Sequence, residues 1–328
     1  MGDETGKLDY EFMKILVTGG AGFIGAHVAK KLLEAGQEVV IVDNLNDYYD
    51  PQLKKDRLKI FLAGLKFEFY KANISDYKQL KKIFAKHKFD GICHLAAQAG
   101  VRHSLINPWL YETTNIAGTV NLLELAKVNK IKKFVFASSS SVYGGNNKLP
   151  FSETDLVDKP VSLYAATKKS GEIIAYYYSL YGLKVCALRF FTVYGPWGRP
   201  DMAYFKFADL MRNNKPIDVY NNGRMKRDFT YIDDIVAGVI AALEADFNFE
   251  IINLGNDRPE ELSKLIELLE NNLSRKAEKN YLPMQAGDVI ATWADITKAR
   301  RFLNYRPQTS LEQGIAAFVK WYKNYYKT

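Results

Sequence analysis

A glycine-rich turn near the N-terminus is the feature that most constrains how this chain can fold. The run KILVTG (14–19) is continuously apolar and rich in β-branched residues, and an amphipathic stretch follows over 23–35. Gly19, Gly22 and Gly25 stand between and within them in the pattern G-x-x-G-x-x-G. Glycine permits a sharp turn and lets a helix pack closely against a strand. The segment therefore predicts a strand–turn–helix unit, either as a structural turn or as a phosphate-binding one.

Short apolar runs and longer amphipathic stretches alternate through the first half of the chain. Continuous apolar strands that alternate with helices are typical of a parallel sheet covered on both faces. Right-handed crossovers then give a doubly wound α/β fold of the Rossmann type. The expected strands lie at 14–19, 38–43, 66–72, 91–97 and 133–140, and the expected helices at 23–35, 51–63, 76–87 and 110–129.

The second half has a less regular pattern, which predicts a smaller C-terminal α/β region folded over the strand ends of the first. We expect a disordered extension at 1–12, a mainly dinucleotide-binding domain at 13–190 and a mainly substrate-binding domain at 191–328. Some strands and helices of the last part should return to the first domain. The expected elements here are helices at 162–182, 203–213, 259–272, 295–303 and 310–327, and strands at 184–191, 217–220 and 250–254.

Composition places the chain among ordinary globular proteins. Hydrophobic residues make up 48% and charged residues 25% of the sequence, and no apolar run approaches the roughly 18 residues that cross a bilayer. The polar, acidic N-terminal segment predicts a cytoplasmic protein without a secretory signal. The net charge of +8 comes from dispersed lysines, which argues against nucleic-acid binding. Cys93 and Cys186 lie inside apolar runs, so we expect buried thiols and neither a disulfide nor a metal site.

An acidic residue at the end of the second predicted strand strengthens the dinucleotide interpretation of the glycine turn. Asp43 follows Gly25 by 43 − 25 = 18 positions, and a carboxylate at this distance accepts hydrogen bonds from a ribose 2′-OH. It would also repel a 2′-phosphate. No arginine follows directly, because the next residues are Asn44, Leu45 and Asn46. The pattern therefore predicts NAD rather than NADP as the cofactor.

A tyrosine, a lysine and a run of serines suggest acid–base chemistry. Tyr164 and Lys168 are four positions apart in a helical pattern and so lie on one helix face. A free phenol has a pKa near 10, and an ammonium beside it would lower that pKa and favour the phenolate. The run Ser138–Ser141 ends the fifth predicted strand, where doubly wound sheets bind ligands. A serine there can hydrogen-bond the oxygen that Tyr164 deprotonates, or it can simply cap a turn.

From about Met13 to its C-terminus the chain resembles the extended short-chain dehydrogenase/reductase family, and within it the nucleotide-sugar epimerases. The resemblance rests on the motifs above and on HLAAQAGVR, NIAGTVNLLE, SSSSVYG, LRFFTVYGP and RDFTYIDDIVAG. It implies that Ser139 aligns the sugar hydroxyl, that Tyr164 is the base and that Lys168 is its partner. Asn115 would support the cofactor side of the site. The residues expected to line the cofactor are Gly19, Gly22, Phe23, Ile24, Gly25, Asp43, Asn44, Asn46, Asn73, Ile74, Leu95, Ala96, Ala97, Gln98, Tyr164 and Lys168.

One departure from the family pattern concerns the cofactor. Many relatives have Asp where this chain has Asn73. The Asn73 carbonyl oxygen can still accept a hydrogen bond from the adenine amino group.

The family contains epimerases, dehydratases, decarboxylases and reductases, so the fold leaves the reaction open. Dehydratases of the family have an Asp-Glu pair after the catalytic hydroxyl residue, whereas this chain has Ser140 and Ser141. These hydroxyls cannot act as acid and base near neutral pH. The resemblance therefore implies a 4-epimerisation, in which Tyr164 takes the 4-OH proton and the C4 hydride passes to NAD⁺. The hydride then returns to the other face of a 4-keto sugar.

The resemblance also implies where a UDP-sugar would bind. Arg227 would pair with the diphosphate, Tyr220 would pack against uracil and Asp288 would contact the uridine ribose. Many glucose/galactose epimerases have Arg where this chain has Gln285, so the resemblance does not extend to the diphosphate contact of that Arg.

Three stretches, at 42–58, 195–203 and 284–289, resemble the UDP-glucuronate 4-epimerases in particular. A uronic acid has a C5 carboxylate, which must not be buried without partners. Ser140, Ser141 and Thr192 would supply neutral donors, and Arg199 would supply a cation, either by direct contact or by shaping its loop. The expected reaction converts UDP-glucuronate to UDP-galacturonate.

Two alternatives have different functions. One is a UDP-glucose/galactose or UDP-N-acetylhexosamine 4-epimerase, and the other is a non-catalytic NAD-binding regulator with the same fold. The retained Tyr164 and Lys168 argue against the regulator. Family resemblance implies a homodimer through the helices near 110–129 and 162–182, while the role of Arg102 stays open.

Overall fold

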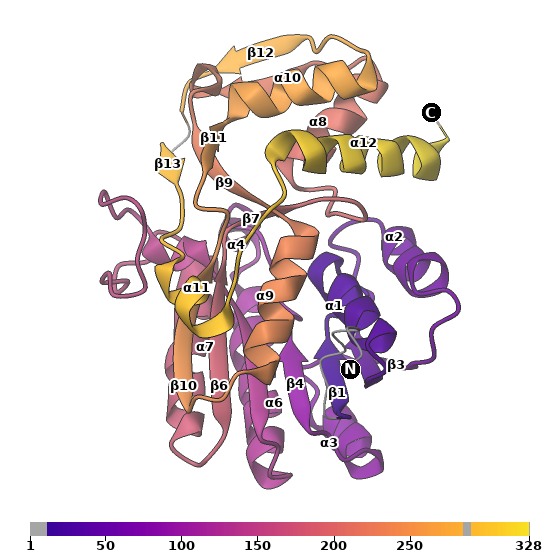
Figure 1. The fold of residues 1–328 in the computed structure, drawn as a ribbon, viewed down its shortest axis with the longest axis vertical. Helices are drawn as coiled ribbons and strands as arrows, with labels where there is room; N and C mark the ends of the chain where they lie inside the picture. The colour runs from indigo at the N-terminus through magenta and orange to yellow at the C-terminus, as the bar shows by residue number, and fades with distance from the viewer. Residues whose placement is uncertain (1–11, 285–289, 328) are drawn as a thin grey trace, which may run out of the picture.

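A seven-stranded parallel sheet forms the centre of the larger part of the molecule (Figure 1). This computed structural model describes residues 12–284 and 290–327. The strand order is β10-β6-β5-β4-β1-β2-β3 and every neighbouring pair is parallel, so the predicted doubly wound α/β fold is confirmed. The strands are β1 (Lys14–Thr18), β2 (Glu38–Asp43), β3 (Glu68–Lys71), β4 (Gly91–His94), β5 (Lys133–Ser139), β6 (Lys184–Phe190) and β10 (Phe249–Leu254).

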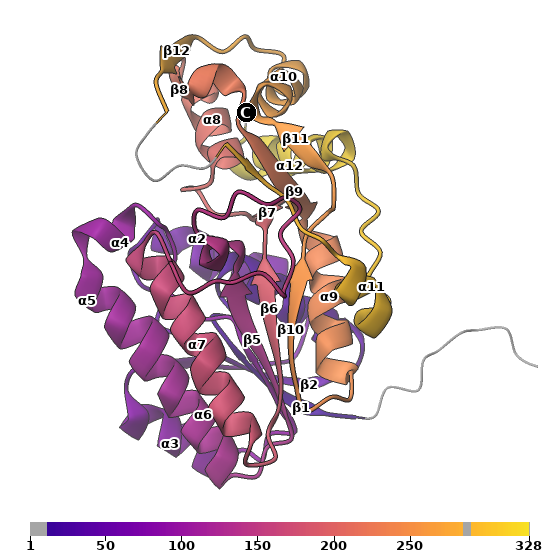
Figure 2. The same cartoon turned by 90° about the vertical axis from the view of Figure 1, so that its left-hand side faces the viewer.

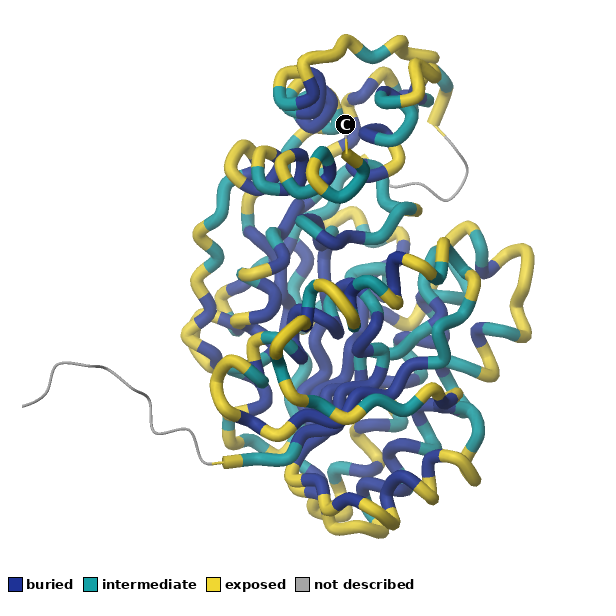
Figure 3. Tube along the Cα trace, turned by 90° about the vertical axis from the view of Figure 1, so that its right-hand side faces the viewer, coloured by how far each residue is buried: buried dark blue, intermediate teal, exposed yellow. Residues whose placement is uncertain are grey.

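Helices cover both faces of this sheet (Figure 2). Side chains alternate between the faces along each strand: Ile15 and Val17 belong to one buried cluster, and Leu16 belongs to the other. Figure 3 shows the strands as the buried centre of the chain. The first cluster packs on α1 (Phe23–Glu34), α9 (Ile232–Glu244) and α11 (Thr297–Leu303), and the second on α3 (Tyr77–Lys86), α6 (Gly118–Val128) and α7 (Leu163–Ser179).

The smaller C-terminal region lies beyond the carboxyl ends of the central strands (Figure 1). Its core is a third buried cluster rich in aromatic residues. One sheet contains β7 (Thr192–Tyr194), β9 (Lys226–Tyr231), β11 (Pro259–Glu261) and β13 (Ala291–Thr292), and a second pairs β8 (Ile217–Tyr220) with β12 (Lys279–Leu282). The helices are α8 (Ala203–Arg212), α10 (Leu262–Leu273) and α12 (Leu311–Tyr326).

The structure differs from the sequence prediction mainly in this second half. Strands β7 and β9 and helix α9 were not predicted, and β11 occupies the start of a predicted helix at 259–272. Two predicted helices are divided. The first becomes α2 (Pro51–Asp56) and η1 (Arg57–Phe61), and the second becomes α5 (Pro108–Tyr111), η2 (Glu112–Ala117) and α6. Smaller helical segments are α4 (His103–Ile106), η3 (Ser140–Tyr143) and η4 (Asn221–Gly223).

Three further expectations concern single features. Cys93 and Cys186 are free and buried, as predicted, and burial raises the pKa of Cys93 to about 12. Within 12–284 and 290–327, no helix is both long and apolar enough to cross a membrane. The predicted extension at 1–12 lies outside the described residues except for Phe12.

The order of the strands in the central sheet reverses at one point. The strand order reverses between β1 and β4, which are neighbours although β2 and β3 lie between them in sequence. In doubly wound folds, ligands bind in the crevice outside the carboxyl ends of the strands at such a reversal. The glycine turn follows β1, so the predicted site begins at this crevice.

Candidate active site

The glycine turn is built so that larger side chains would not fit. Gly19 has a φ of +70°, and a Cβ added to it would lie 2.7 Å from the Ala96 nitrogen. A Cβ on Gly25 would lie 2.1 Å from the Gly19 carbonyl oxygen, because α1 packs directly on the turn. Gly22 occupies the N-cap of α1, so no side chain accepts a hydrogen bond from the first N–H groups of the helix. The free N–H groups and the positive end of the helix therefore face the crevice, as a pyrophosphate requires.

Asp43 ends β2 beside this turn, with its carboxylate held by backbone groups. Its Oδ2 accepts a hydrogen bond from the Ala21 nitrogen at 3.1 Å and its Oδ1 accepts one from the Leu45 nitrogen at 2.8 Å. Lys54, which the sequence pattern did not single out, is buried nearby. Its Nζ donates to the Asn46 carbonyl oxygen at 2.7 Å and also contacts the Asn46 side-chain oxygen. Burial lowers the pKa of Lys54, and the charge of Asp43 opposes that effect.

A cavity of about 230 Å³ connects the glycine turn with the predicted catalytic residues. Tyr164 and Lys168 project into it from α7, and Ser139 reaches it from the end of β5. Every predicted cofactor residue except Asn115 lines this cavity: Gly19, Gly22, Phe23, Ile24, Gly25, Asp43, Asn44, Asn46, Asn73, Ile74, Leu95, Ala96, Ala97, Gln98, Tyr164 and Lys168.

Asn115 lies behind the wall of the cavity and joins two elements that form it. Its Oδ1 accepts a hydrogen bond from the Gln98 nitrogen at 2.8 Å. Its Nδ2 donates to the Gln98 carbonyl oxygen at 2.9 Å and to the Thr167 hydroxyl at 3.1 Å. Asn115 therefore fixes the loop after β4 against the helix that carries Tyr164.

The environment of Tyr164 and Lys168 differs from the sequence expectation. Burial raises the pKa of Tyr164, while a hydrogen bond with Ser139 and the charge of Arg199 oppose the increase. Lys168 is not among the groups that shift this pKa, and its Nζ donates to the Ala137 carbonyl oxygen at 2.8 Å. Burial, helped by Arg199, lowers the pKa of Lys168 itself to about 7. Lys168 is thus close to its own titration at neutral pH.

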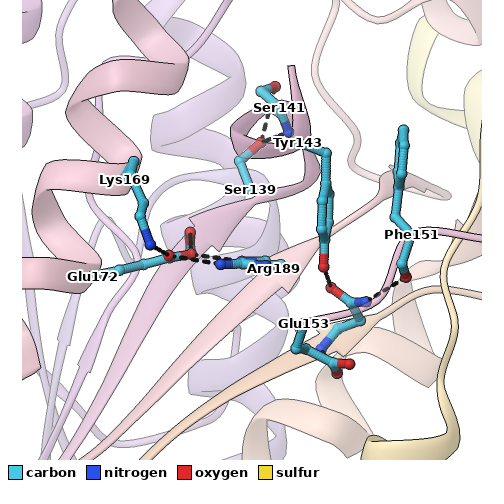
Figure 4. A network of polar contacts seen from close by, with 10 residues as sticks. Ser139, Ser141, Tyr143, Phe151, Glu153, Lys169, Glu172 and Arg189 are labelled. Atoms are coloured by element: carbon cyan, nitrogen blue, oxygen red, sulfur yellow. Dashed lines mark hydrogen bonds and ion pairs between the residues drawn. The ribbon is translucent and has the colours of Figure 1, made fainter. Parts of the chain in front are cut away.

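The serine run forms a tight turn at the end of β5 (Figure 4). The Ser139 hydroxyl accepts a hydrogen bond from the Ser141 nitrogen at 3.2 Å and donates one to the Ser141 hydroxyl at 3.1 Å. Ser140 and Ser141 begin η3 and lie outside the cavity lining, as does Thr192 on β7. Of the predicted substrate residues Ser139, Ser140, Ser141 and Thr192, only Ser139 lies at the cavity wall.

Arg199 lines the cavity and is paired with an acidic neighbour that sequence reasoning missed. Its Nε donates to Asp201 Oδ1 at 3.0 Å and its Nη2 to Asp201 Oδ2 at 2.5 Å. The Tyr48 hydroxyl also donates to Asp201, at 3.3 Å, and the Tyr48 ring lies 6.0 Å from the guanidinium carbon. Burial opposes the charge of Arg199, but Asp201 outweighs it, so the pKa of Arg199 lies above its usual value.

Two of the residues predicted for the nucleotide half of the substrate, Tyr220 and Arg227, are described and do not line this cavity. Tyr220 ends β8, and the Arg102 guanidinium carbon lies 5.3 Å from its ring centre. Arg227 is on β9, where its Nη1 donates to the Lys226 carbonyl oxygen at 2.8 Å. Asp288, like Gln285, lies outside the described residues. The contacts predicted for these residues stay predictions.

A buried ion pair fixes the elements that carry the predicted catalytic residues (Figure 4). Glu172 lies one helical turn beyond Lys168 and accepts hydrogen bonds from Ser138 Oγ at 2.6 Å and from Arg189 Nε at 2.8 Å. Its second oxygen accepts from Arg189 Nη2 at 2.9 Å. Glu172 therefore ties α7 to the ends of β5 and β6. The sequence pattern did not predict the pair of Glu172 and Arg189, because the two residues lie in separate segments, α7 and β6.

Comparison with known proteins agrees with this geometry. Residues 15–255 match the model of the NAD dependent epimerase/dehydratase family. A UDP-glucuronate 4-epimerase from Thermodesulfobacterium geofontis is 49% identical over 94% of this chain and 95% of its own length. Among solved structures, the UDP-glucuronic acid 4-epimerase of Bacillus cereus with UDP-glucuronic acid and NAD has a TM-score of 0.88. It is 38% identical, over 96% of this chain and 100% of that chain.

A solved neighbour with another substrate shows what the fold alone leaves open. The UDP-glucose 4-epimerase of Thermotoga maritima has a TM-score of 0.87 and 35% identity, over 96% of this chain and 100% of that chain. Fold similarity therefore does not separate the two sugars, and the residues of the site must do so. Since the family model covers most of the chain, the chain belongs to the NAD dependent epimerase/dehydratase family.

Proposed function

We propose that this protein is an NAD-dependent UDP-glucuronate 4-epimerase, an isomerase that forms UDP-galacturonate. The observation that carries the proposal is the single cavity that joins the glycine turn and Asp43 to Tyr164, Lys168 and Ser139, with Arg199 on its wall. The relatives named above support the same reaction.

The residues of the cavity fit a bound NAD. The turn at Gly19 and Gly25 has room for no side chain, so backbone N–H groups can approach a pyrophosphate. Asp43 presents a carboxylate for the ribose hydroxyls, and Lys54 lies beside it. When bound, NAD⁺ takes up the C4 hydride of the sugar and gives it back.

The protein's own residues would move the proton. Ser139 holds the 4-OH of the sugar by a hydrogen bond, and the Tyr164 phenolate takes its proton as C4 is oxidised. Lys168, fixed to the Ala137 carbonyl oxygen, stays within reach of the cofactor ribose. The 4-keto sugar then turns within the cavity, so that reduction occurs on its other face and Tyr164 returns the proton. A nearby cation such as Arg199 favours the phenolate during the first step.

We propose a uronic acid rather than a neutral sugar as the substrate because the cation Arg199 lies on the cavity wall. Asp201 occupies Nε and Nη2 of Arg199. Among residues 12–284 and 290–327, Nη1 of Arg199 has no hydrogen-bond acceptor, so it can donate to a C5 carboxylate. We propose that the neutral donors Ser140, Ser141 and Thr192 complete that contact once substrate is bound. A 4-keto uronic acid is a β-keto acid, and a carboxylate held by several donors resists loss of CO₂.

Incubating the purified protein with UDP-glucuronate and NAD⁺ and separating the products by anion-exchange chromatography tests this function. We expect a mixture of UDP-glucuronate and UDP-galacturonate from either starting compound. A UDP-pentose as the sole product, or no product, would contradict the proposal. A parallel incubation with UDP-glucose measures the neutral-sugar activity, which we expect to be much lower.

We also propose domain roles and an assembly. Residues 13–190 would mainly bind NAD, and residues 191–328 would mainly bind the UDP-sugar. A homodimer through α6 and α7 is supported by exposed apolar side chains on these helices and directly after α7, namely Val128, Ile173, Tyr176, Tyr177, Leu180 and Tyr181. Light scattering should give twice the mass of the 328-residue chain, and the monomer mass would contradict the dimer. The two free cysteines are consistent with the reducing cytoplasm.

A further inference from the structure

Arg57 is a fully buried cation whose N–H groups all bond to neutral oxygen atoms. Its Nε and Nη2 donate to the Trp197 carbonyl oxygen at 2.9 and 2.7 Å, and Nη2 also donates to the Gly198 carbonyl oxygen at 2.8 Å. Its Nη1 donates to the Ala21 carbonyl oxygen at 3.0 Å and to the Tyr49 hydroxyl at 2.7 Å. The side chain is 0% exposed. Five hydrogen bonds therefore use the whole donor fork of the guanidinium.

Within the described part of the chain, no carboxylate forms an ion pair with Arg57. A buried charge without an opposite charge is costly, and only a complete set of hydrogen bonds makes it tolerable. Lysine could not replace it, since an ammonium has three donors and cannot span the same acceptors. The site is thus specific for arginine, which a merely space-filling role would not require.

The carbonyl acceptors of Arg57 belong to two segments that are far apart in sequence. Ala21 is inside the glycine turn, and Trp197 and Gly198 directly precede Arg199. Trp197 has a φ of +57°, which L residues rarely adopt, so the turn needs contacts that hold it. Gly198 leaves no room for a side chain, because an added Cβ would lie 1.8 Å from the Tyr204 hydroxyl. Arg57 supplies two of the bonds that keep the Trp197 carbonyl oxygen in place.

We propose that Arg57 is a positioning residue that fixes the 195–199 loop on the glycine turn and so aims Arg199 at the C5 carboxylate of the sugar. The inference rests on the proposed function, since it assumes that a uronic acid is the substrate. Arg57 itself lies outside the cavity lining and acts through the loop. Selectivity for the acidic sugar would then depend on Arg57, which is 140 positions away from Trp197 in sequence.

Calorimetry on NAD-loaded protein with Tyr164→Phe in the background tests the inference, because this background should bind the sugar nucleotide and convert it only slowly. We expect Arg57→Lys to raise the Kd of UDP-glucuronate about tenfold, the effect of losing charge-assisted bonds at the carboxylate. The Kd of UDP should change less than about twofold, since UDP has no carboxylate. Arg199→Met should raise the Kd of UDP-glucuronate similarly. Combining Arg57→Lys with Arg199→Met should raise this Kd by no more than about a further twofold, because the effects of two substitutions that act through one contact do not add.

Controls separate positioning from general damage. Leu269→Ala removes buried side-chain volume in α10 and should lower the melting temperature without changing the ratio of the two Kd values. If Arg57→Lys does not fold, Tyr49→Phe removes a single acceptor of Arg57 and should shift the ratio about threefold in the same direction. An unchanged ratio in the Arg57 or Tyr49 variant, or additive effects with Arg199→Met, would overturn the inference. If the parent protein binds UDP-glucuronate no more tightly than UDP, the proposed substrate fails instead.

Discussion

Replacing Tyr164 with phenylalanine is expected to lower kcat for epimerisation by about 10²- to 10⁴-fold, the range found when a positioned general base is lost. The substitution removes only the hydroxyl oxygen. The ring keeps its place on α7, where it meets the Tyr111 ring edge-on with centroids 6.2 Å apart. Steady-state rates with UDP-glucuronate give the measurement, and calorimetry should show nearly unchanged NAD affinity.

The same helix offers a matched control for this variant. Tyr176 is on α7 but does not line the cavity, and it is 51% exposed. Tyr176→Phe removes only a hydroxyl outside the cavity and keeps the ring that we propose at the dimer interface, so kcat should stay within about twofold of the parent. Full activity after Tyr164→Phe would instead support the non-catalytic alternative.

The pH dependence of the parent enzyme belongs to the same prediction. Burial raises the pKa of Tyr164, so the phenol is largely protonated at neutral pH. Only the phenolate can act as a base, and its fraction grows about tenfold per pH unit below the pKa. The rate should therefore increase from pH 6 towards pH 9, and Tyr164→Phe should lose this increase. A flat profile in the parent would show that Tyr164 is not the group that titrates.

Replacing Glu172 with glutamine is expected to reduce the free energy of unfolding by about 3–5 kcal/mol, the usual cost of breaking a buried ion pair from one side. Glu172 and Arg189 are each 1% exposed. Glutamine has nearly the same shape but no charge, so the Arg189 guanidinium would stay buried without its counter-ion. Urea denaturation monitored by fluorescence measures the loss. Glu267→Gln, on the exposed face of α10, should change stability by less than about 0.5 kcal/mol.

Acid should reproduce part of this effect in the parent protein. Burial alone would raise the pKa of Glu172, but its hydrogen bonds to Arg189 and Ser138 hold the pKa below the usual value. A carboxyl group with a lowered pKa in the folded state stabilises the protein above its unfolded pKa, near 4.3. That contribution is lost as the pH falls through the lower folded value. The Glu172→Gln variant should therefore lose less stability than the parent below about pH 4; equal losses would contradict the assignment.

Figure 4 shows why breaking the pair of Glu172 and Arg189 should also disturb the elements that carry the catalytic residues. Arg189 also lies over the Tyr143 ring, 4.8 Å from its centre, and the Tyr143 hydroxyl donates to Asn253 Oδ1 at 2.6 Å. Asn253 Nδ2 in turn donates to the Phe151 carbonyl oxygen at 2.9 Å. The network thus joins α7, the serine turn and β10.

Much of the sheet and of the cavity could be predicted from the sequence, because the signals are local. Period and apolar content identified β1 to β6, and the G-x-x-G-x-x-G spacing located the turn that opens α1. The four-residue interval between Tyr164 and Lys168 places both on one face of a single helix. Such features depend on neighbours within a few positions, which the sequence displays directly.

Only the tertiary structure decided the contacts between distant segments. Arg57 and Lys54 have the sequence context of solvent-exposed residues on an amphipathic helix, yet both are buried. Arg199 pairs with Asp201. The short strand β7 forms because it can pair with β9 by hydrogen bonds. A charged side chain is retained in the interior only where oxygen atoms from other segments meet it. The periodicity of a sequence does not report such contacts, since the hydrogen-bond partners of Arg57 lie up to 141 positions away from it.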